Sequence, residues 1–235
     1  HDPARSARRA AGETMNTTLS KALFASAAIA LGATAANYLY PETRWPNYAP
    51  VNHGPYESRD CGPGLSTLVV GASVAYGVGA SDTDHEWWVL ACQDLGGYWY
   101  NAAGGGNLSE HEVQQIAGNP GFDRVIVLDG ANDLVLGLSP QVPGQIEKRL
   151  PRWWRNVAQM RTLRPDLFHV LQPAPFGMPS ANTAGHEDEL RAIYAQMAMW
   201  VDLDLSEASV DYLDLVHFGD RGQRIVADAI VERLR

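Results

Sequence analysis

Apolar and polar positions alternate in a regular way from residue 65 to the end of the chain. Short apolar runs predict buried strands near residues 65–71, 98–101, 124–129, 167–172 and 200–203. The segments between them predict helices near residues 84–95, 108–117, 142–163, 186–199 and 218–234. Such alternation predicts an α/β fold of three layers, in which helices cover both faces of a parallel sheet and ligands bind beyond the carboxyl ends of the strands.

The N-terminal region lacks this alternation. Met15 begins the sequence MNTTLSK, and an alanine-rich run from Ala22 to Ala36 follows shortly after it. A short charged region before an apolar run that ends in small residues is typical of a secretory signal. We therefore expect residues 1–36 to be a leader and signal peptide, within which residues 1–14 are either an upstream translation remnant or part of an extended leader.

An uncleaved signal anchor is the alternative for this region. When the apolar run is extended through Tyr40, it approaches the roughly 20 residues that a membrane-spanning helix needs. Residues 37–63 are rich in proline, tyrosine and tryptophan and predict a strap or linker. Residues 64–235 then form one folded domain, since a chain of 235 residues with 46% hydrophobic content supports one sizeable core.

The charge of the chain excludes some partners. Its formal net charge is −9 at pH 7. An acidic surface binds nucleic acid poorly, because phosphate contacts need lysine and arginine. We expect no nucleic-acid partner, no membrane contact other than through an uncleaved anchor, and a monomer.

Polar and small residues follow several of the predicted strands. Ser73 follows the first strand in GASVAYG, a triple glycine ending at Gly106 follows the second, and Asn132 follows the third in GAND. Asp214 and His217 stand in the sequence DLVH, just before the last predicted helix. Because the carboxyl ends of parallel strands meet at one edge of a sheet, we expect these residues to converge there.

These residue types suit nucleophilic catalysis. A serine hydroxyl is a weak nucleophile until a base takes its proton, and a third group has to hold that base in the right tautomer. Ser73, His217 and Asp214 supply the three groups. Glycines let backbone N–H groups approach a ligand, and the Asn132 amide is a candidate donor to a developing oxyanion. The pattern predicts a hydrolase.

The four motifs resemble the sequence blocks of the SGNH (GDSL-type) hydrolases, a family of serine esterases and lipases, from about Leu65 to the C-terminus. GASVAYG is similar to the nucleophile block, NAAGGGN to the block whose glycine lies five positions after an asparagine, GAND to the GxND block, and DLVH to the DxxH block. The resemblance implies a flavodoxin-like fold with a five-stranded parallel sheet. It also implies an oxyanion hole made by the Ser73 N–H, the Gly106 N–H and the Asn132 side chain, with His217 as general base and then acid, oriented by Asp214.

One position departs from the family pattern. The usual GDS is GAS in this chain, so Ala72 replaces the aspartate. That position is not the nucleophile, the base or an oxyanion donor. We therefore expect the change to affect the support and rigidity of the turn that carries Ser73 more than the catalytic chemistry.

Each motif also has a plainer interpretation. A GxS turn can be an ordinary strand-to-helix turn, a triple glycine a flexible loop, an Asn-Asp pair a helix cap, and His217 a core histidine. The order and shared position of all four favour the hydrolase. GASVAYGVG lacks the GxGxxG spacing of a dinucleotide site, and the histidines lack a metal-ligand spacing, so we expect no cofactor and no metal.

Two further features concern the substrate pocket and the cysteines. The loop from Pro173 to His186 carries Phe176 and Met178, which are candidate substrate-binding residues. Cys61 precedes the first predicted strand, and Cys92 lies late in the first predicted helix, which runs back to the same end of the sheet. This topology predicts a disulfide, and two unpaired thiols are the alternative.

These observations together predict an exported serine esterase that works through an acyl-enzyme. Because the nucleophile and DLVH regions resemble exopolysaccharide-associated members of the family, O-acetylated carbohydrate or small acyl esters are the favoured substrates. Alternatives are a lipid acyl hydrolase of the lysophospholipase or thioesterase type, an acyltransferase, and a non-catalytic glycan-binding accessory protein, since fold does not determine substrate.

Overall fold

A computed structural model describes residues 57–130, 132–133, 146–174, 187–210, 212–213 and 217–235. The predicted signal segment of residues 1–36 and most of the predicted linker lie outside these residues. None of the helices within the described ranges has an apolar stretch long enough to cross a membrane.

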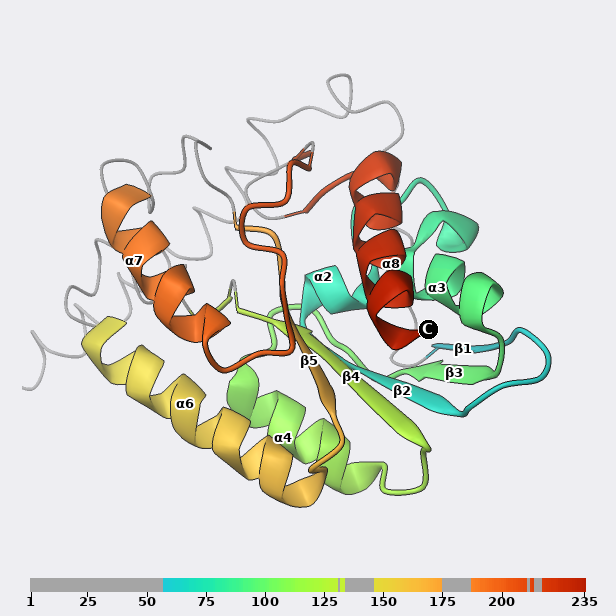
Figure 1. Cartoon of the computed structure of the whole chain (residues 1–235), viewed down its shortest axis with the longest axis horizontal. Helices are drawn as coiled ribbons and strands as arrows, with labels where there is room; N and C mark the ends of the chain where they lie inside the picture. The colour runs from blue at the N-terminus through green and yellow to red at the C-terminus, as the bar shows by residue number, and fades with distance from the viewer. Residues whose placement is uncertain (1–56, 131, 134–145, 175–186, 211, 214–216) are drawn as a thin grey trace, which may run out of the picture. The chain divides into compact units, whose positions relative to one another are not determined.

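The described strands form one six-stranded sheet (Figure 1). In chain order the strands are β1 (Glu57–Asp60), β2 (Thr67–Gly71), β3 (Tyr98–Asn101), β4 (Arg124–Asp129), β5 (Phe168–Leu171) and β6 (Leu203–Asp204). Their order across the sheet is β1-β3-β2-β4-β5-β6, and β2 to β6 are parallel. All five predicted strands are present, although the last is Leu203–Asp204 rather than residues 200–203, and the predicted α/β class is confirmed.

The edge strand β1 corrects the expected strand count from five to six. It lies within the segment predicted to be a strap, and it pairs antiparallel with β3, from Glu57 opposite Asn101 to Asp60 opposite Tyr98. Its sequence ESRD is polar, and only alternate residues are half buried. An edge strand held by backbone pairing needs no apolar run, so hydrophobic patterning does not reveal it.

Helices cover both faces of the sheet (Figure 1). One face packs against α3 (Trp87–Leu95), α8 (Asp220–Leu234) and the short helix α2 (Ser73–Tyr76), and the other against α4 (Ser109–Gly118), α6 (Ile146–Leu163) and α7 (Glu187–Ala198). A 3₁₀ turn, η2 (Thr83–His85), precedes α3. The five longer helices correspond to the predicted ones, whereas α2 is too short to show in a helical pattern.

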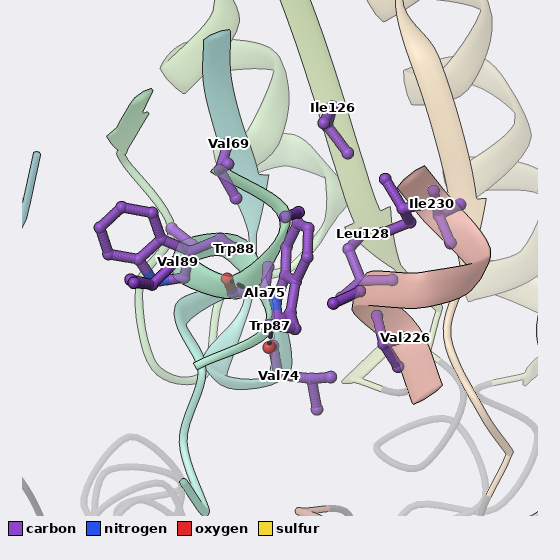
Figure 2. Close-up of a cluster of buried hydrophobic side chains, with 14 of the residues drawn as sticks. Val69, Val74, Ala75, Trp87, Trp88, Val89, Ile126, Leu128, Val226 and Ile230 are labelled. Atoms are coloured by element: carbon purple, nitrogen blue, oxygen red, sulfur yellow. Dashed lines mark hydrogen bonds between the residues drawn. The ribbon is translucent and has the colours of Figure 1, made fainter. Parts of the chain in front are cut away.

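Large aromatic side chains fill the core on the α3 and α8 face. Trp87 and Trp88 are fully buried among aliphatic residues of β2, β4 and α8, as Figure 2 shows. The Trp87 indole also donates to the Val74 and Ala75 carbonyls, both at 3.1 Å. Each buried indole removes roughly 150–250 Å² from water. The core thus stabilises the domain and at the same time holds α2.

The two cysteines form the predicted disulfide. Cys61 follows β1 and Cys92 lies on α3, with their Cα atoms 5.8 Å apart. The Cys61 N–H also donates to the Gly97 carbonyl at 2.9 Å, which continues the pairing of β1 with β3. The bond therefore joins the edge strand to a core helix.

Removal of this disulfide should destabilise the domain. The bond closes a loop with a sequence separation of 31 residues, and restricting the unfolded chain to that extent stabilises the fold by roughly 2–4 kcal/mol. Cys61→Ala/Cys92→Ala should lose that amount in urea unfolding under oxidising conditions. Under reducing conditions the double variant and wild type should differ much less in unfolding free energy. Equal stability of the double variant and wild type under oxidising conditions would contradict the prediction.

Candidate active site

Ser73 and His217 meet at the carboxyl edge of the sheet. Ser73 is the first residue of α2, directly beyond β2, and His217 lies three residues before α8. The Ser73 Oγ and the His217 Nε2 are 2.8 Å apart, and both residues are partly exposed. This distance lies within the range for proton transfer between a hydroxyl and a base. A neutral imidazole that accepts this proton on Nε2 carries its own hydrogen on Nδ1.

Three of the predicted site residues lie outside the described residues. They are Asp214, expected to orient the imidazole, and Phe176 and Met178, expected to contact the substrate. Their roles stay predictions.

The start of α2 has no side-chain cap. Ala72 is the N-cap residue, with extended backbone angles, and no side-chain hydrogen bond is made there. An aspartate in this position would accept from the free N–H groups of the first turn, and losing such a cap costs about 0.5–2 kcal/mol. The departure seen in the sequence therefore removes local support at the nucleophile.

Side chains from three other elements hold the far end of α2. In addition to the Trp87 indole, the Asn101 amide donates to the Ala75 and Tyr76 carbonyls at 3.2 and 3.3 Å. The Gln223 amide, on α8, donates to the Gly77 and Val78 carbonyls at 3.1 and 3.2 Å. These bonds satisfy carbonyls that a short helix leaves unpaired. Sequence analysis missed Gln223, because nothing in the chain marks a polar residue on a buried helix face for this role.

Gly77 ends α2 and lies against a buried acid. Its φ of +104° is in the left-handed region, and an added Cβ would lie 2.6 Å from the Glu86 Cγ. Glu86 is fully buried and accepts from the Trp88 indole at 2.5 Å. The pKa of Glu86 is raised to about 8, mainly because the group is buried. The Trp88 hydrogen bond lowers this pKa, and the nearby Glu57 and Asp82 carboxylates raise it.

The raised pKa of Glu86 predicts a pH-dependent stability. Between pH 4.5 and 8 the folded protein keeps a proton that the unfolded chain releases, so the unfolding free energy falls as pH rises through this window. Glu86→Gln keeps an acceptor for Trp88 and removes the titration. In urea unfolding, the unfolding free energy of Glu86→Gln minus that of wild type should therefore rise by about 1 kcal/mol or more from pH 5 to pH 8. The exposed Glu232→Gln on α8 is the control, and a difference that stays constant with pH would contradict the prediction.

The glycine turn after β3 is tied to the end of β2. The Gly104 N–H and the Asn107 side-chain amide both donate to the Gly71 carbonyl, at 3.1 and 3.2 Å. Gly71 ends β2 two residues before Ser73. Gly106 is exposed within the turn and has a φ of +76°, which a residue with a side chain rarely adopts.

Asn132 contacts the same turn from the end of β4. Its Nδ2 donates to the Asn107 carbonyl at 2.9 Å. This bond uses one amide hydrogen and orients the group, and the second hydrogen remains as a donor. Ser73, His217, Asn132 and the turn that carries Gly106 thus belong to one edge of the sheet.

A network of buried polar side chains lies beneath this edge of the sheet, on the face that packs against α4 and α6. Asp133 accepts from the backbone N–H and the hydroxyl of Ser109, at 3.0 and 3.1 Å, and thereby joins β4 to the start of α4. Asp129 accepts from the Trp153 indole and from the His169 Nε2, both at 2.8 Å. The buried carboxyl of Glu112 lies in the same network.

Burial sets the protonation of these carboxyls. The pKa of Asp133 is raised to about 6, because burial and the Asp129 charge outweigh the lowering effect of the Ser109 hydrogen bonds. Burial also holds the pKa of Glu112 well above its usual range, again with a contribution from Asp129. Sequence analysis missed this network except for Asp133, which the GAND motif contains but to which no role was assigned.

Comparison with known proteins supports the fold. No protein-family model matches the sequence, and no curated protein matches it. Among solved structures, an acetyl xylan esterase matches with a TM-score of 0.54 and 16% identity over 72% of this chain and 100% of its own. A carbohydrate acetylesterase family member from Sinorhizobium meliloti matches with a TM-score of 0.51 and 16% identity, over 72% of this chain and 97% of its own.

A third similar structure is a two-part protein. It is a carbohydrate esterase family 2 enzyme with a carbohydrate binding domain from Corynascus thermopiles (Myceliophthora fergusii), with a TM-score of 0.52 and 15% identity over 73% of this chain and 65% of its own. Identities this low establish the fold alone. The chain therefore has the three-layer α/β fold that these solved esterase structures share, which agrees with the fold class predicted from its sequence.

Proposed function

We propose that the protein is a serine esterase that acts through an acyl-enzyme. The observation that carries this proposal is the 2.8 Å contact between the Ser73 Oγ and the His217 Nε2, at the edge of the sheet where Asn132 and the glycine turn also lie. A hydroxyl in contact with an imidazole beside several N–H donors is the arrangement that acyl transfer needs.

The proposed reaction has two halves. His217 accepts the Ser73 proton on Nε2 as Oγ attacks the ester carbonyl, and the oxyanion forms against the Ser73 N–H, the Gly106 N–H and the Asn132 amide. The intermediate collapses to the acyl-enzyme, and His217 returns the proton to the departing alcohol. Water then attacks the acyl-enzyme and loses a proton to His217. The second intermediate collapses to the carboxylic acid, and His217 returns that proton to the departing Ser73 Oγ. Asp214 is assigned the orientation of the imidazole.

O-acetylated carbohydrate is the substrate class that we propose. The sequence motifs resemble those of exopolysaccharide-associated hydrolases, and the structures with this fold include an acetyl xylan esterase and two carbohydrate esterases. The acidic chain is compatible with a neutral glycan.

Export from the cytoplasm is part of the proposal. Structural disulfides persist mainly in oxidising compartments, and the Cys61–Cys92 bond joins the edge strand to the core. The charged and apolar pattern that begins at Met15 supports the same location.

A panel of esters tests the activity. We expect the full chain to hydrolyse 4-nitrophenyl acetate faster than the butyrate and octanoate esters, and to release acetate from acetylated xylan. Preference for the octanoate ester together with inactivity on acetylated glycans would favour a lipid acyl hydrolase. Inactivity on every ester, with wild-type folding, would favour the accessory protein and overturn the proposal.

A further inference from the structure

An open groove lies between α4 and β3, beside the glycine turn. Its volume is about 560 Å³, which is within the usual range for small-molecule sites. Gly104 and Asn107 line one end, next to the proposed oxyanion donors, and Gly118 and Asn119 line the other end. The groove therefore runs along α4, away from Ser73.

Among the described elements, α4 leaves part of the sheet uncovered, and the groove lies there. Along β3, Trp99 and Asn101 are buried on the α3 face, whereas Tyr98 and Tyr100 on the opposite side are exposed and half exposed. Alternate residues of a strand point to opposite faces. On the α4 face the helix packs against β2 and β4, so within the described part of the chain β3 forms an open floor.

Amides and an aromatic ring dominate the lining. Four amide side chains and one imidazole line the groove, namely Asn107, Gln114, Gln115, Asn119 and His111. At its floor the Tyr100 ring stacks on Phe122, with 5.8 Å between ring centroids. No carboxylate, lysine or arginine is among the lining residues that the structure describes.

The amides keep both donors and acceptors for a ligand. Gln115 uses its carbonyl oxygen to accept from the Gly71 N–H at 3.2 Å, so its NH₂ group remains as a donor. Asn107 and Asn119 donate from Nδ2 to the Gly71 and Gln115 carbonyls, at 3.2 and 2.8 Å, so their carbonyl oxygens remain as acceptors. Mixed donors and acceptors beside an aromatic face match the hydroxyl groups and apolar face of a pyranose ring.

We propose that this groove binds the chain of a neutral oligosaccharide, with the esterified sugar residue at Ser73. The inference rests on the proposed function and names its substrate more closely. A neutral glycan fits better than an anionic one, because no lysine or arginine is among the described residues that line the groove and the protein carries a net charge of −9. Hydrogen bonding by uncharged amides needs no counter-ion.

Two glycines make a matched test of the groove. An added Cβ at Gly118 or at Gly121 meets no atom within 4 Å, both residues are exposed, and neither has a positive φ. Only Gly118 lines the groove. Gly118→Tyr should therefore fill the groove without disturbing the fold, and Gly121→Tyr places the same side chain three residues further along the chain.

The first readout separates the groove from the reacting centre. On acetylated xylo-oligosaccharides of four or more residues, Gly118→Tyr should lower kcat/KM about tenfold or more, mainly through KM. On 4-nitrophenyl acetate, which has no sugar chain, it should match wild type, and Gly121→Tyr should match wild type on both substrates. An equal loss on both substrates, or no loss on either, would overturn the proposal.

The second readout does not depend on catalysis. Calorimetric titration of the full chain with unacetylated xylohexaose, cellohexaose and mannohexaose should show binding of at least one sugar, weakened about tenfold or more by Gly118→Tyr and unchanged by Gly121→Tyr. Sugar binding without ester hydrolysis would support the proposal that the groove binds an oligosaccharide and would contradict the proposal that the protein is an esterase. Hydrolysis of 4-nitrophenyl acetate without binding of any of the three sugars would overturn the groove and leave the esterase proposal standing.

Discussion

Ser73→Ala is expected to reduce ester hydrolysis by about 10⁴- to 10⁶-fold. The hydroxyl is the group that would form the covalent bond to the acyl carbon, and its Oγ lies 2.8 Å from the His217 Nε2. Without it the N–H donors can still polarise a carbonyl, which leaves a small residual rate. The measurement is the initial rate on 4-nitrophenyl acetate, with circular dichroism to verify folding.

A serine at the opposite edge of the sheet provides the control. Ser66 precedes β2 and donates to Asp123 at 2.7 Å, so Ser66→Ala removes a structural hydroxyl far from the carboxyl edge and should keep near wild-type activity. A fluorophosphonate probe should modify the peptide that contains Ser73 in wild type and nothing in Ser73→Ala. Modification at another residue, or full turnover by Ser73→Ala, would reject the assignment.

Asn132→Ala is expected to lower kcat by about 10²- to 10³-fold, the scale found when one oxyanion donor is removed. As the tetrahedral intermediate forms, negative charge develops on the substrate oxygen. A donor already oriented by its bond to the Asn107 carbonyl then stabilises the transition state more than the bound ester. KM should therefore change little, which separates this role from ordinary substrate binding.

A second asparagine distinguishes catalysis from structural support. The Asn156 amide on α6 donates to the Ser109 hydroxyl at 2.9 Å, within the network below the site. Asn156→Ala should cost stability in urea unfolding and leave kcat within about tenfold of wild type. If Asn132→Ala is folded and keeps near-normal kcat, the residue is only a link between β4 and the glycine turn, and the proposed oxyanion hole is wrong.

The hydrophobic pattern located the parallel strands well because they are buried on both faces. Val69, Val70, Val125 and Val127 are fully buried, so each strand stands out as an apolar run between polar segments. The polar strand β1 carries no such signal and was missed. Its position depends on the unpaired backbone groups at the edge of β3 and on the disulfide that follows it.

The site residues were predictable only to the extent that each motif stands at a strand end. Ser73 and Asn132 both follow apolar strands, and parallel topology brings such positions to one edge. The contact between Ser73 and His217 involves residues 144 positions apart in the chain, so no local pattern measures it. The sequence also does not reveal that Asn101 and Gln223 hold the short helix that carries the serine, since their partners are backbone carbonyls of another segment.

The sequence by itself thus determined the α/β class, five of the six strands, and the residue types that gather at the carboxyl edge, because hydrophobic periodicity indicates which segments are buried strands and helices. Only the tertiary structure decided how Glu86, Glu112 and Asp133 are buried, which sets their raised pKa values. It alone also decided that, among the described elements, α4 leaves the β3 face open beside the glycine turn. Both features depend on how elements pack against one another, and the spacing of residues along one element contains no information about the neighbours that will cover it.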